Sequence, residues 1–220
     1  GSMSGDLVIG KAAAQVVLGD LSQTYNGSAK VASATTTPEG LNVGLTYDGS
    51  STAPSNAGTY PVVATIINAN YQGSASDTLV IGKAMATVTL GDLSQTYDGS
   101  AKSASAATTP EGLAVDVTYN GSSTAPTGAG TYAVVATIND PNYEGSANGD
   151  LVIGKALASM TLGDLSQTYD GGAKTPSVTT TPEGLAVDVT YDGNTEAPVN
   201  AGIYAVAATI NDANYEGSAS

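Results

Sequence analysis

The side chains best suited to chemistry lie in a short polar loop that recurs along the chain. Two copies of the loop carry oxygen-bearing side chains at the same spacing: Asp140, Asn142, Glu144, Asp212, Asn214 and Glu216. Oxygen ligands this close together are what calcium requires. The remaining copy has Asn68, Asn70 and Gln72, which lack carboxylates. We therefore interpret these loops as structural turns, with a weak calcium site as the alternative.

A second acidic pattern could indicate glycoside hydrolysis, which uses two carboxylates. Two copies of one segment provide such a pair, namely Glu111 with Asp116 and Glu183 with Asp188. The other copy has Gly44 at the aspartate position, so its pair is broken. Catalytic pairs are not normally repeated in every unit of an array, and we expect solvated turn and strand residues here. No catalytic residue is predicted.

Lysines and tyrosines offer two further kinds of site. A lysine could form an isopeptide bond with an asparagine, and a row of tyrosines could stack on sugars. The six lysines, however, stand near the ends of expected strands, and the twelve tyrosines occur four to a repeat beside turns and at inward strand positions. Solvated lysines and core or corner tyrosines are the simpler interpretation.

The composition argues against several classes of function. The chain has no His, Cys, Arg, Trp or Phe, so it lacks the usual nucleophile–base pairs, thiolate or imidazole zinc ligands and arginine clamps. Its net charge of −14 opposes binding to nucleic acid, and no apolar stretch is long enough to span a bilayer. The sequence predicts a protein that is not an enzyme, has no cofactor, binds no nucleic acid and does not insert into a membrane.

The elements that must position these residues repeat at a fixed step. An Ala-Gly-Thr/Ile-Tyr motif followed by an alternating apolar run places Tyr60, Tyr132 and Tyr204 at intervals of 72 residues. Landmarks elsewhere keep the same step, so one unit has been copied without insertion or deletion. No flexible linker separates the copies, and neighbouring repeats should be held at restricted angles.

Each repeat is expected to consist of strands. In the middle copy, apolar and polar residues alternate over 84–90, 113–119 and 129–138, which is typical of half-buried strands. Residues 102–109 suggest a strand near a sheet edge, and 151–154 a short closing strand. Turn-forming Gly, Pro, Asn and Asp separate them. The prediction is all-β, with three tandem 72-residue immunoglobulin-like β-sandwich modules in an extended array.

Two resemblances sharpen this picture. Ala-Gly-Thr-Tyr before an alternating strand resembles the tyrosine corner of immunoglobulin-like sandwiches, which gives Tyr60, Tyr132 and Tyr204 a structural role. The fuller pattern of Thr-Tyr-Asp-Gly, Thr-Pro-Glu-Gly-Leu, Asn-Tyr-Glu-Gly and Leu-Val-Ile-Gly-Lys-Ala resembles the MBG or YDG-type repeats of bacterial cell-surface proteins. That resemblance implies extracellular β-rich modules in tandem, with a β-grasp-like variant of the topology as an alternative.

The fragment does not begin at the start of a repeat. We expect an expression scar at 1–3, the closing strand of a preceding repeat at 4–11, and repeats at 12–83, 84–155 and 156–220. On this division the third repeat lacks its own closing strand. The N-terminal Leu7, Val8 and Ile9 could fill that position by strand addition, in another molecule or in the same one, or could instead belong with the first repeat.

The function expected from these observations is structural. The chain should be a spacer or stalk segment of a bacterial surface or secreted adhesin-like protein, with neighbouring repeats as partners and head-to-tail self-association as a further option. The alternative is a calcium-dependent or glycan-binding adhesive module whose loops make the contact.

Overall fold

The computed structural model describes residues 3–220, and it contains strands and turns with no helix in that range. Gly1 and Ser2 of the expected expression scar lie outside the described residues, and Met3 is fully exposed. The all-β prediction is confirmed. No helix in the described part of the chain has the length and apolarity needed to cross a membrane.

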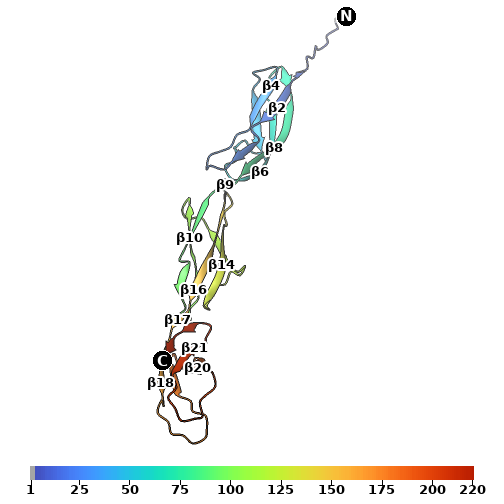
Figure 1. Cartoon of the computed structure of the whole chain (residues 1–220). Coiled ribbons are helices and arrows are strands. Elements are labelled where there is room, and N and C mark those ends of the chain that lie inside the picture. The colour runs from blue at the N-terminus through green and yellow to red at the C-terminus, as the bar shows by residue number, and fades with distance from the viewer. Residues whose placement is uncertain (1–2) are drawn as a thin grey trace. The chain divides into compact units, whose positions relative to one another are not determined.

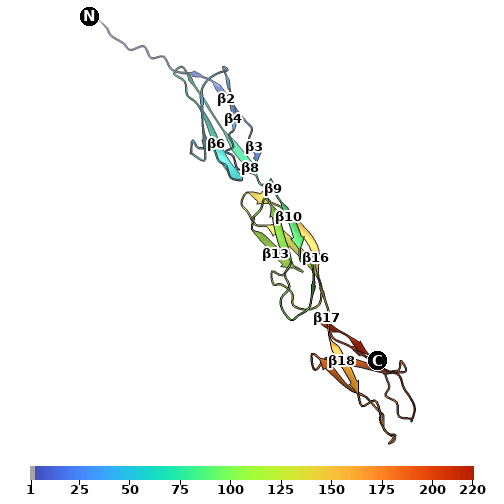
Figure 2. The same ribbon diagram turned by 90° about the vertical axis from the view of Figure 1, so that its left-hand side faces the viewer.

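The first repeat has eight strands arranged in two layers. Their bounds are β1 (Ala12–Ala13), β2 (Gln15–Gly19), β3 (Ser22–Thr24), β4 (Ser33–Thr37), β5 (Val43–Tyr47), β6 (Gly58–Ile66), β7 (Tyr71–Gln72) and β8 (Ser74–Gly82). One layer is a four-stranded sheet in the order β3-β8-β6-β5, and the other is the antiparallel pair β2-β4. Strand β2 contacts both β6 and β8 across the interior (Figures 1 and 2).

The four-stranded sheet of the first repeat is mixed. Strand β6 runs antiparallel to both β5 and β8, whereas β3 runs parallel to β8, with Ser22 opposite Val80. Strand β1 is also parallel to its partner β7. These parallel pairs are an addition to the antiparallel pattern of a simple immunoglobulin sandwich.

The second repeat follows the same plan. Its strands are β9 (Ala84–Met85), β10 (Thr87–Gly91), β11 (Ser94–Thr96), β12 (Ser105–Thr109), β13 (Val115–Tyr119), β14 (Gly130–Ile138), β15 (Tyr143–Glu144) and β16 (Ser146–Gly154). They form the sheet β11-β16-β14-β13 and the pairs β10-β12 and β15-β9. The expected edge position of residues 102–109 is therefore found in β12, which forms a two-stranded sheet with β10.

The third repeat has fewer strands. They are β17 (Ala156–Leu157), β18 (Ser159–Gly163), β19 (Ser177–Thr181), β20 (Val187–Tyr191), β21 (Val206–Ile210), β22 (Tyr215–Glu216) and β23 (Ser218–Ala219). Its larger sheet has three strands, β20-β21-β23, beside the pairs β18-β19 and β17-β22. Strand β21 covers five residues, whereas its counterparts β6 and β14 each cover nine.

The chain divides into two compact units whose boundary cuts through the second repeat. One unit comprises 1–87, 108–115 and 137–146, and the other comprises 88–107, 116–136 and 147–220. The loops at one end of the second repeat thus belong with the first repeat, and those at its other end belong with the third. Each passage from one repeat to the next lies within a single compact unit.

Alternating residues of the long strands form the core. In the first repeat Val62, Leu79 and Ile81 are almost completely buried and pack with Tyr47 and Ala32. The second repeat has the same cluster one step later, formed by Tyr119, Val134, Leu151 and Ile153. The inward face predicted by the alternation over 129–138 is correct, since Val134, Ala136 and Ile138 are all buried.

Two-residue turns with positive φ close the hairpins that the sequence predicts. Asn120 and Gly121 have φ of 49° and 83°, and the residues on either side, Tyr119 and Ser122, bridge across them. An Asn or Asp followed by Gly suits such a turn because both residues accept this conformation. The Thr37–Pro38, Thr109–Pro110 and Thr181–Pro182 bonds are cis, which the sequence analysis did not predict.

Three details differ from the expected strands. The run 84–90 is interrupted between β9 and β10, because β9 pairs with β15 while β10 pairs with β12. Gly145 lies against this break, and a Cβ there would be 2.1 Å from the Ala86 carbonyl oxygen. Strand β11 forms in a segment where no strand was predicted, and the closing strand β16 begins at Ser146, well before the expected residue 151.

Candidate functional site

The site built most consistently by this fold is the junction between consecutive repeats. We use the term junction for the contacts that join one repeat to the loop before the last long strand of the next. Strand β8 ends at Gly82 and β9 begins at Ala84, so only Lys83 separates them. The backbone N–H of Ala84 donates to the Asn142 carbonyl at 2.9 Å, which ties the start of the second repeat to that repeat's own loop.

The tyrosines of two repeats meet at each junction. In the first junction the rings of Tyr25 and Tyr143 lie edge to face, with centroids 5.3 Å apart and an interplanar angle of 81°. In the second, Tyr97 and Tyr215 repeat the arrangement at 5.3 Å and 83°. The edge of one ring is electropositive and the face of the other electronegative, so this geometry is attractive.

An asparagine side chain joins the repeats by a hydrogen bond. The backbone N–H of Ala57 donates to Oδ1 of Asn142 at 2.9 Å. The Nδ2 group of Asn142 in turn donates to Oδ1 of Asn56 at 3.4 Å. In the second junction the N–H of Ala129 donates to Oδ1 of Asn214 at 2.8 Å. An amide can donate and accept at once, so it can engage a loop of the neighbouring repeat from both sides.

The predicted tyrosine corners position the loop that receives this asparagine. The Tyr60 hydroxyl donates to the carbonyl of Asn56, four residues upstream, at 3.0 Å. The hydroxyls of Tyr132 and Tyr204 donate in the same way to the carbonyls of Gly128 and Asn200. Because the corner fixes the backbone just before Ala57, it also fixes the N–H that meets Asn142.

Aspartates and lysines hold the loop that carries the junction asparagine. Oδ1 of Asp140 accepts hydrogen bonds from the backbone N–H groups of Asn142 at 2.7 Å and Tyr143 at 3.0 Å. The Asp140 carbonyl accepts from Nζ of Lys83 at 2.6 Å, across the passage between repeats. Asp212 and Lys155 make the equivalent contacts in the second junction.

The first repeat makes the same loop with an amide. Oδ1 of Asn68 accepts from the N–H groups of Asn70 and Tyr71, and Nζ of Lys11 donates to the Asn68 carbonyl. A carbonyl-type oxygen is all that this turn needs. The loss of the carboxylate in the first copy therefore leaves the turn intact.

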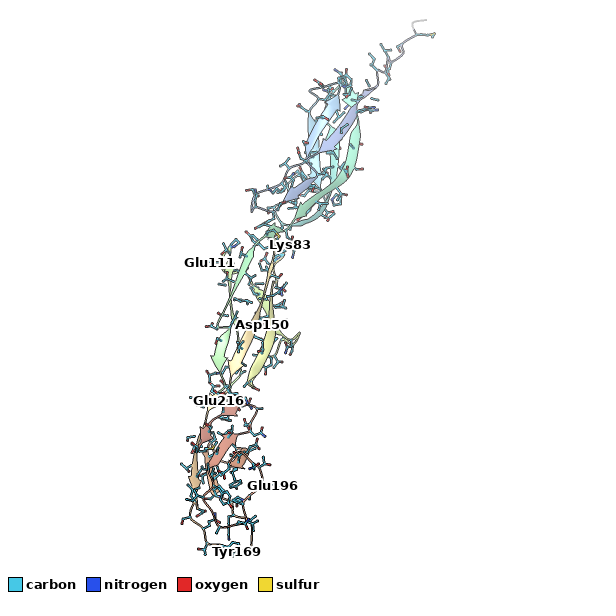
Figure 3. The ribbon with its side chains drawn as sticks, in the orientation of Figure 1. Lys83, Glu111, Asp150, Tyr169, Glu196 and Glu216 are labelled. Atoms are coloured by element: carbon cyan, nitrogen blue, oxygen red, sulfur yellow. The ribbon has the colours of Figure 1, made fainter. Side chains whose placement is uncertain are left out.

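The candidate calcium ligands take separate positions in these loops. Asp140 and Asp212 accept backbone N–H groups, and Asn142 and Asn214 reach the preceding repeat. Glu144 and Glu216 are exposed in the short strands β15 and β22 (Figure 3 labels Glu216). Within residues 3–220, no three His, Cys, Asp or Glu side chains come together as a metal-binding group.

The candidate glycosidase carboxylates lie on the surface. Glu111 and Glu183 stand in exposed turns, and Asp116 and Asp188 point outward from β13 and β20. An exposed carboxylate lacks the apolar surroundings of a catalytic acid.

A carboxylate–lysine pair recurs in the second and third repeats. Lys102 lies 2.6 Å from the Asp98 carboxylate, and Lys174 lies 2.5 Å from that of Asp170. The hydrogen bonds from Lys102 and then from Ser100 hold the pKa of Asp98 well below its usual range. Lys174 likewise lowers the pKa of Asp170. Both carboxylates are solvent-exposed, so these pairs act locally on their turns.

The core and corner roles predicted for the tyrosines do not include the paired rings. Tyr25 and Tyr143 belong to different repeats and to different positions within the repeat, so no local pattern links them. The available signal was the strict step of 72 residues at both positions, which marks a contact that recurs with the repeat.

Comparison with known families agrees with this repeated architecture. The family model described as the MBG domain matches residues 14–85, 86–157 and 158–220. These ranges start two residues later than the expected repeats at 12, 84 and 156. No match was found among curated protein sequences. Tandem MBG repeats are typical of the repeat regions of surface proteins. The resemblance is confirmed, and the chain belongs to the MBG domain family, with three such domains in tandem.

Proposed function

We propose that this chain is a non-catalytic spacer segment of an extracellular adhesin-like protein, in which each junction limits the movement of one repeat against the next. The observation that carries the proposal is the recurrence of the same contacts at both junctions. Each has an edge-to-face tyrosine pair, an asparagine bonded to a loop of the preceding repeat, and a lysine bonded to the loop carbonyl.

The magnitudes support a coupled junction. An edge-to-face aromatic pair contributes about 0.5–1.5 kcal/mol beyond the apolar area it buries. A hydrogen bond between neutral groups adds about 1 kcal/mol. In repeat proteins such nearest-neighbour terms add to the intrinsic stability of each unit. A flexible Gly/Ser linker would contribute none of these terms, and the passage through Lys83 leaves no room for one.

The test measures how freely the first two repeats move relative to each other. The chain has no cysteine, so cysteines introduced at the exposed Val63 and Val135 can carry spin labels without background. We expect a narrow distribution of label distances in the parent chain. Replacing both Asn142 and Tyr143 by alanine should broaden it, because the hydrogen bond to Ala57 and the ring contact with Tyr25 are lost.

The matched control changes a neighbour that makes no junction contact through its side chain. Glu144→Ala alters the exposed residue next to Tyr143 and should leave the distance distribution narrow. A broad distribution in the parent chain would contradict the spacer function, since the repeats would then move independently whatever their junction contacts.

A further inference from the structure

One short sequence occurs twice in the chain and adopts two different structures. Residues 24–28 and residues 118–122 both read Thr-Tyr-Asn-Gly-Ser. An asparagine followed by glycine is prone to lose its side-chain amide, because glycine has no Cβ to keep its peptide nitrogen away from the asparagine side chain. The two copies have the same neighbours in sequence, so any difference in their reactivity comes from the fold.

The copy at 118–122 is a closed hairpin turn. The Asn120 N–H donates to the Ala133 carbonyl at 2.8 Å, and Oδ1 of Asn120 accepts the Ala133 N–H at 2.9 Å. Tyr119 and Ser122 exchange backbone hydrogen bonds of 2.7 and 2.9 Å across the turn. Loss of the amide requires the side-chain carbonyl carbon to meet the Gly121 nitrogen, so some of these bonds must break first.

The copy at 24–28 is an open turn. Asn26 is exposed, and its Oδ1 accepts the backbone N–H of Ser28 at 3.1 Å. This hydrogen bond folds the carboxamide over the intervening Gly27 peptide, whose φ is 81°. The same N–H can stabilise the negative charge that develops on Oδ1 when a nucleophile attacks Cγ. The fold therefore leaves Asn26 in a conformation close to the one that reacts.

A third Asn-Gly pair, Asn148-Gly149, lies in the middle of strand β16. In the sheet order, β16 stands between β11 and β14. Pairing on both sides holds the extended backbone of the strand, so this pair is also kept from the folded-over conformation that the reaction needs.

A lysine without a partner stands beside Asn26. In the second repeat Lys102 is paired with Asp98, and the Lys102 N–H donates to the Pro126 carbonyl at 2.8 Å. The Lys30 N–H donates in the same way to the Pro54 carbonyl at 2.8 Å, so the lysine backbone is held alike.

The ammonium group of Lys30 differs from the others in its contacts. Within residues 3–220 it has no hydrogen bond or ion pair, whereas Nζ of each of the other five lysines has one. The physical reason is the amide of Asn26. With Oδ1 bonded to Ser28, the group left for the lysine is Nδ2, and Nδ2 and an ammonium are both donors.

We propose that Asn26 is a site of spontaneous deamidation in the folded chain, and that the aspartate formed there takes up an ion pair with Lys30. The second and third repeats carry this pair in their sequence, as Asp98 with Lys102 and Asp170 with Lys174. The reaction replaces the donor Nδ2 by an acceptor oxygen at the position that the lysine can reach.

The reaction uses only groups of the turn and water. The Gly27 peptide nitrogen loses its proton to water and forms a bond to Cγ of Asn26. The Cγ–Nδ2 bond breaks, and the amide nitrogen takes up a proton and leaves as ammonia, which gives a succinimide ring. Water then adds at Cγ, the bond from Cγ to the Gly27 nitrogen breaks, and that nitrogen regains its proton. Residue 26 is then an aspartate.

The change adds a negative charge next to a junction residue. Tyr25, whose ring contacts Tyr143, directly precedes Asn26. In the second junction the ring of Tyr97 contacts Tyr215, and the paired Asp98 directly follows Tyr97. Deamidation at Asn26 therefore gives the first junction the same charged turn that the second junction has.

Peptide mapping by mass spectrometry tests the site. The whole chain is incubated in its folded state at mildly alkaline pH, and the conversion of amide to acid is followed at each Asn-Gly pair. We expect Asn26 to react at least about tenfold faster than Asn120, because the hydrogen bonds of Asn120 must first break. In urea the two sites should react at the same rate, since their pentapeptides are identical. Equal rates in the folded chain, or a faster reaction at Asn120, would overturn the proposal.

A second measurement tests the ion pair. Asn26→Asp supplies the product directly, and the other two repeats already have aspartate at this position, so the variant should fold. NMR titration should place the pKa of the new carboxyl below its usual range, as for Asp98. Adding Lys30→Ala should return that pKa to the usual range. An Asn26→Asp pKa that does not respond to Lys30→Ala, or a deamidation product that is only iso-aspartate, would refute the pairing. The spin-label distances describe the unmodified chain, so the spacer function and the deamidation site stand or fall separately.

Discussion

The ring edge of one tyrosine meets the ring face of another across the first junction, where Tyr25 and Tyr143 have centroids 5.3 Å apart. The two residues come from different repeats and lie far apart in the sequence. Their contact ties the loop of Tyr143 to the core of the first repeat, since Tyr25 also packs against the buried cluster of that repeat. A change at Tyr143 should therefore be felt in the repeat that precedes it.

Tyr143→Ala should lower the stability of the first junction. The loss of the aromatic pair alone amounts to about 0.5–1.5 kcal/mol, and lost apolar burial adds to it. Chemical denaturation of the chain at low concentration measures the change. Tyr71→Ala removes the same side chain from the first repeat, and no ring contact of Tyr71 is found in the described residues. An equal loss in both variants would contradict a specific role for the pair.

Tyr47→Phe should destabilise the first repeat more than Tyr60→Phe. The N–H of Ala32 donates to the Tyr47 hydroxyl at 3.0 Å, and both residues are buried. Removing the Tyr47 hydroxyl leaves the buried N–H of Ala32 without a partner, which costs about 1–3 kcal/mol. The corner hydroxyl of Tyr60 donates to an exposed loop carbonyl that water can satisfy, so about 1 kcal/mol is expected there. Urea denaturation of the two variants gives the order.

Gly145→Ala should be strongly unfavourable. A Cβ at this position would lie 2.1 Å from the carbonyl oxygen of Ala86, so the backbone between β9 and β10 has to move. Overpacking of this kind costs about 1–3 kcal/mol. Gly154→Ala is the matched control, since its Cβ would be 3.8 Å from the nearest backbone oxygen. Thermal unfolding should place the Gly154 variant near the parent chain and the Gly145 variant below it.

The Asp98–Lys102 pair predicts a local pH dependence. The hydrogen bond from Lys102 lowers the pKa of Asp98 in the folded chain. The ionised Asp98 side chain therefore contributes its full stabilisation above the unfolded pKa of about 3.9, and this contribution is lost as the pH falls toward the lower pKa of the folded chain. Lys102→Ala should raise the pKa of Asp98, which NMR titration of its carboxyl carbon can follow. The first repeat has Asn26 at the position of Asp98, so it has no carboxyl group to titrate there. An unchanged Asp98 pKa in the variant would contradict this origin.

Calcium should not stabilise the chain. Oδ1 of Asp140 and of Asp212 already accepts two backbone N–H groups, and the nearby glutamates are exposed. We expect the melting temperature to be the same in calcium and in EDTA. A melting temperature that rises saturably with calcium would contradict this expectation, provided that the rise is lost in the double variant Asp140→Asn with Glu144→Gln. That result would favour the calcium-dependent adhesive module instead.

Much of the fold could be predicted because its signal is local. Alternation placed Val134, Ala136 and Ile138 on the inward face, and the Asn120-Gly121 pair marked a turn whose conformation few other residues accept. Repetition then extended each local inference to three copies. The family could be recognised for the same reason, because its motifs sit in these turns and strand starts.

What could not be predicted depends on contacts between distant segments. The short strand β11 has an unremarkable sequence and exists because β16 offers it a parallel edge. The break at Ala86 is imposed by the close approach of Gly145. Asp140, Asn142 and Glu144 suggested a calcium site as an alternative to a structural turn, because a sequence gives the ligand types but not the direction in which each oxygen points.

The parallel pairing of the first and last strands of a repeat has a mechanical consequence. Residues 12–13 pair in parallel with 71–72, and residues 22–24 pair in parallel with 80–82. A pull on the two ends of the repeat therefore slides these segments past each other along their length. Their hydrogen bonds are loaded in shear and must break together, whereas an antiparallel hairpin pulled at its open end unzips one bond at a time.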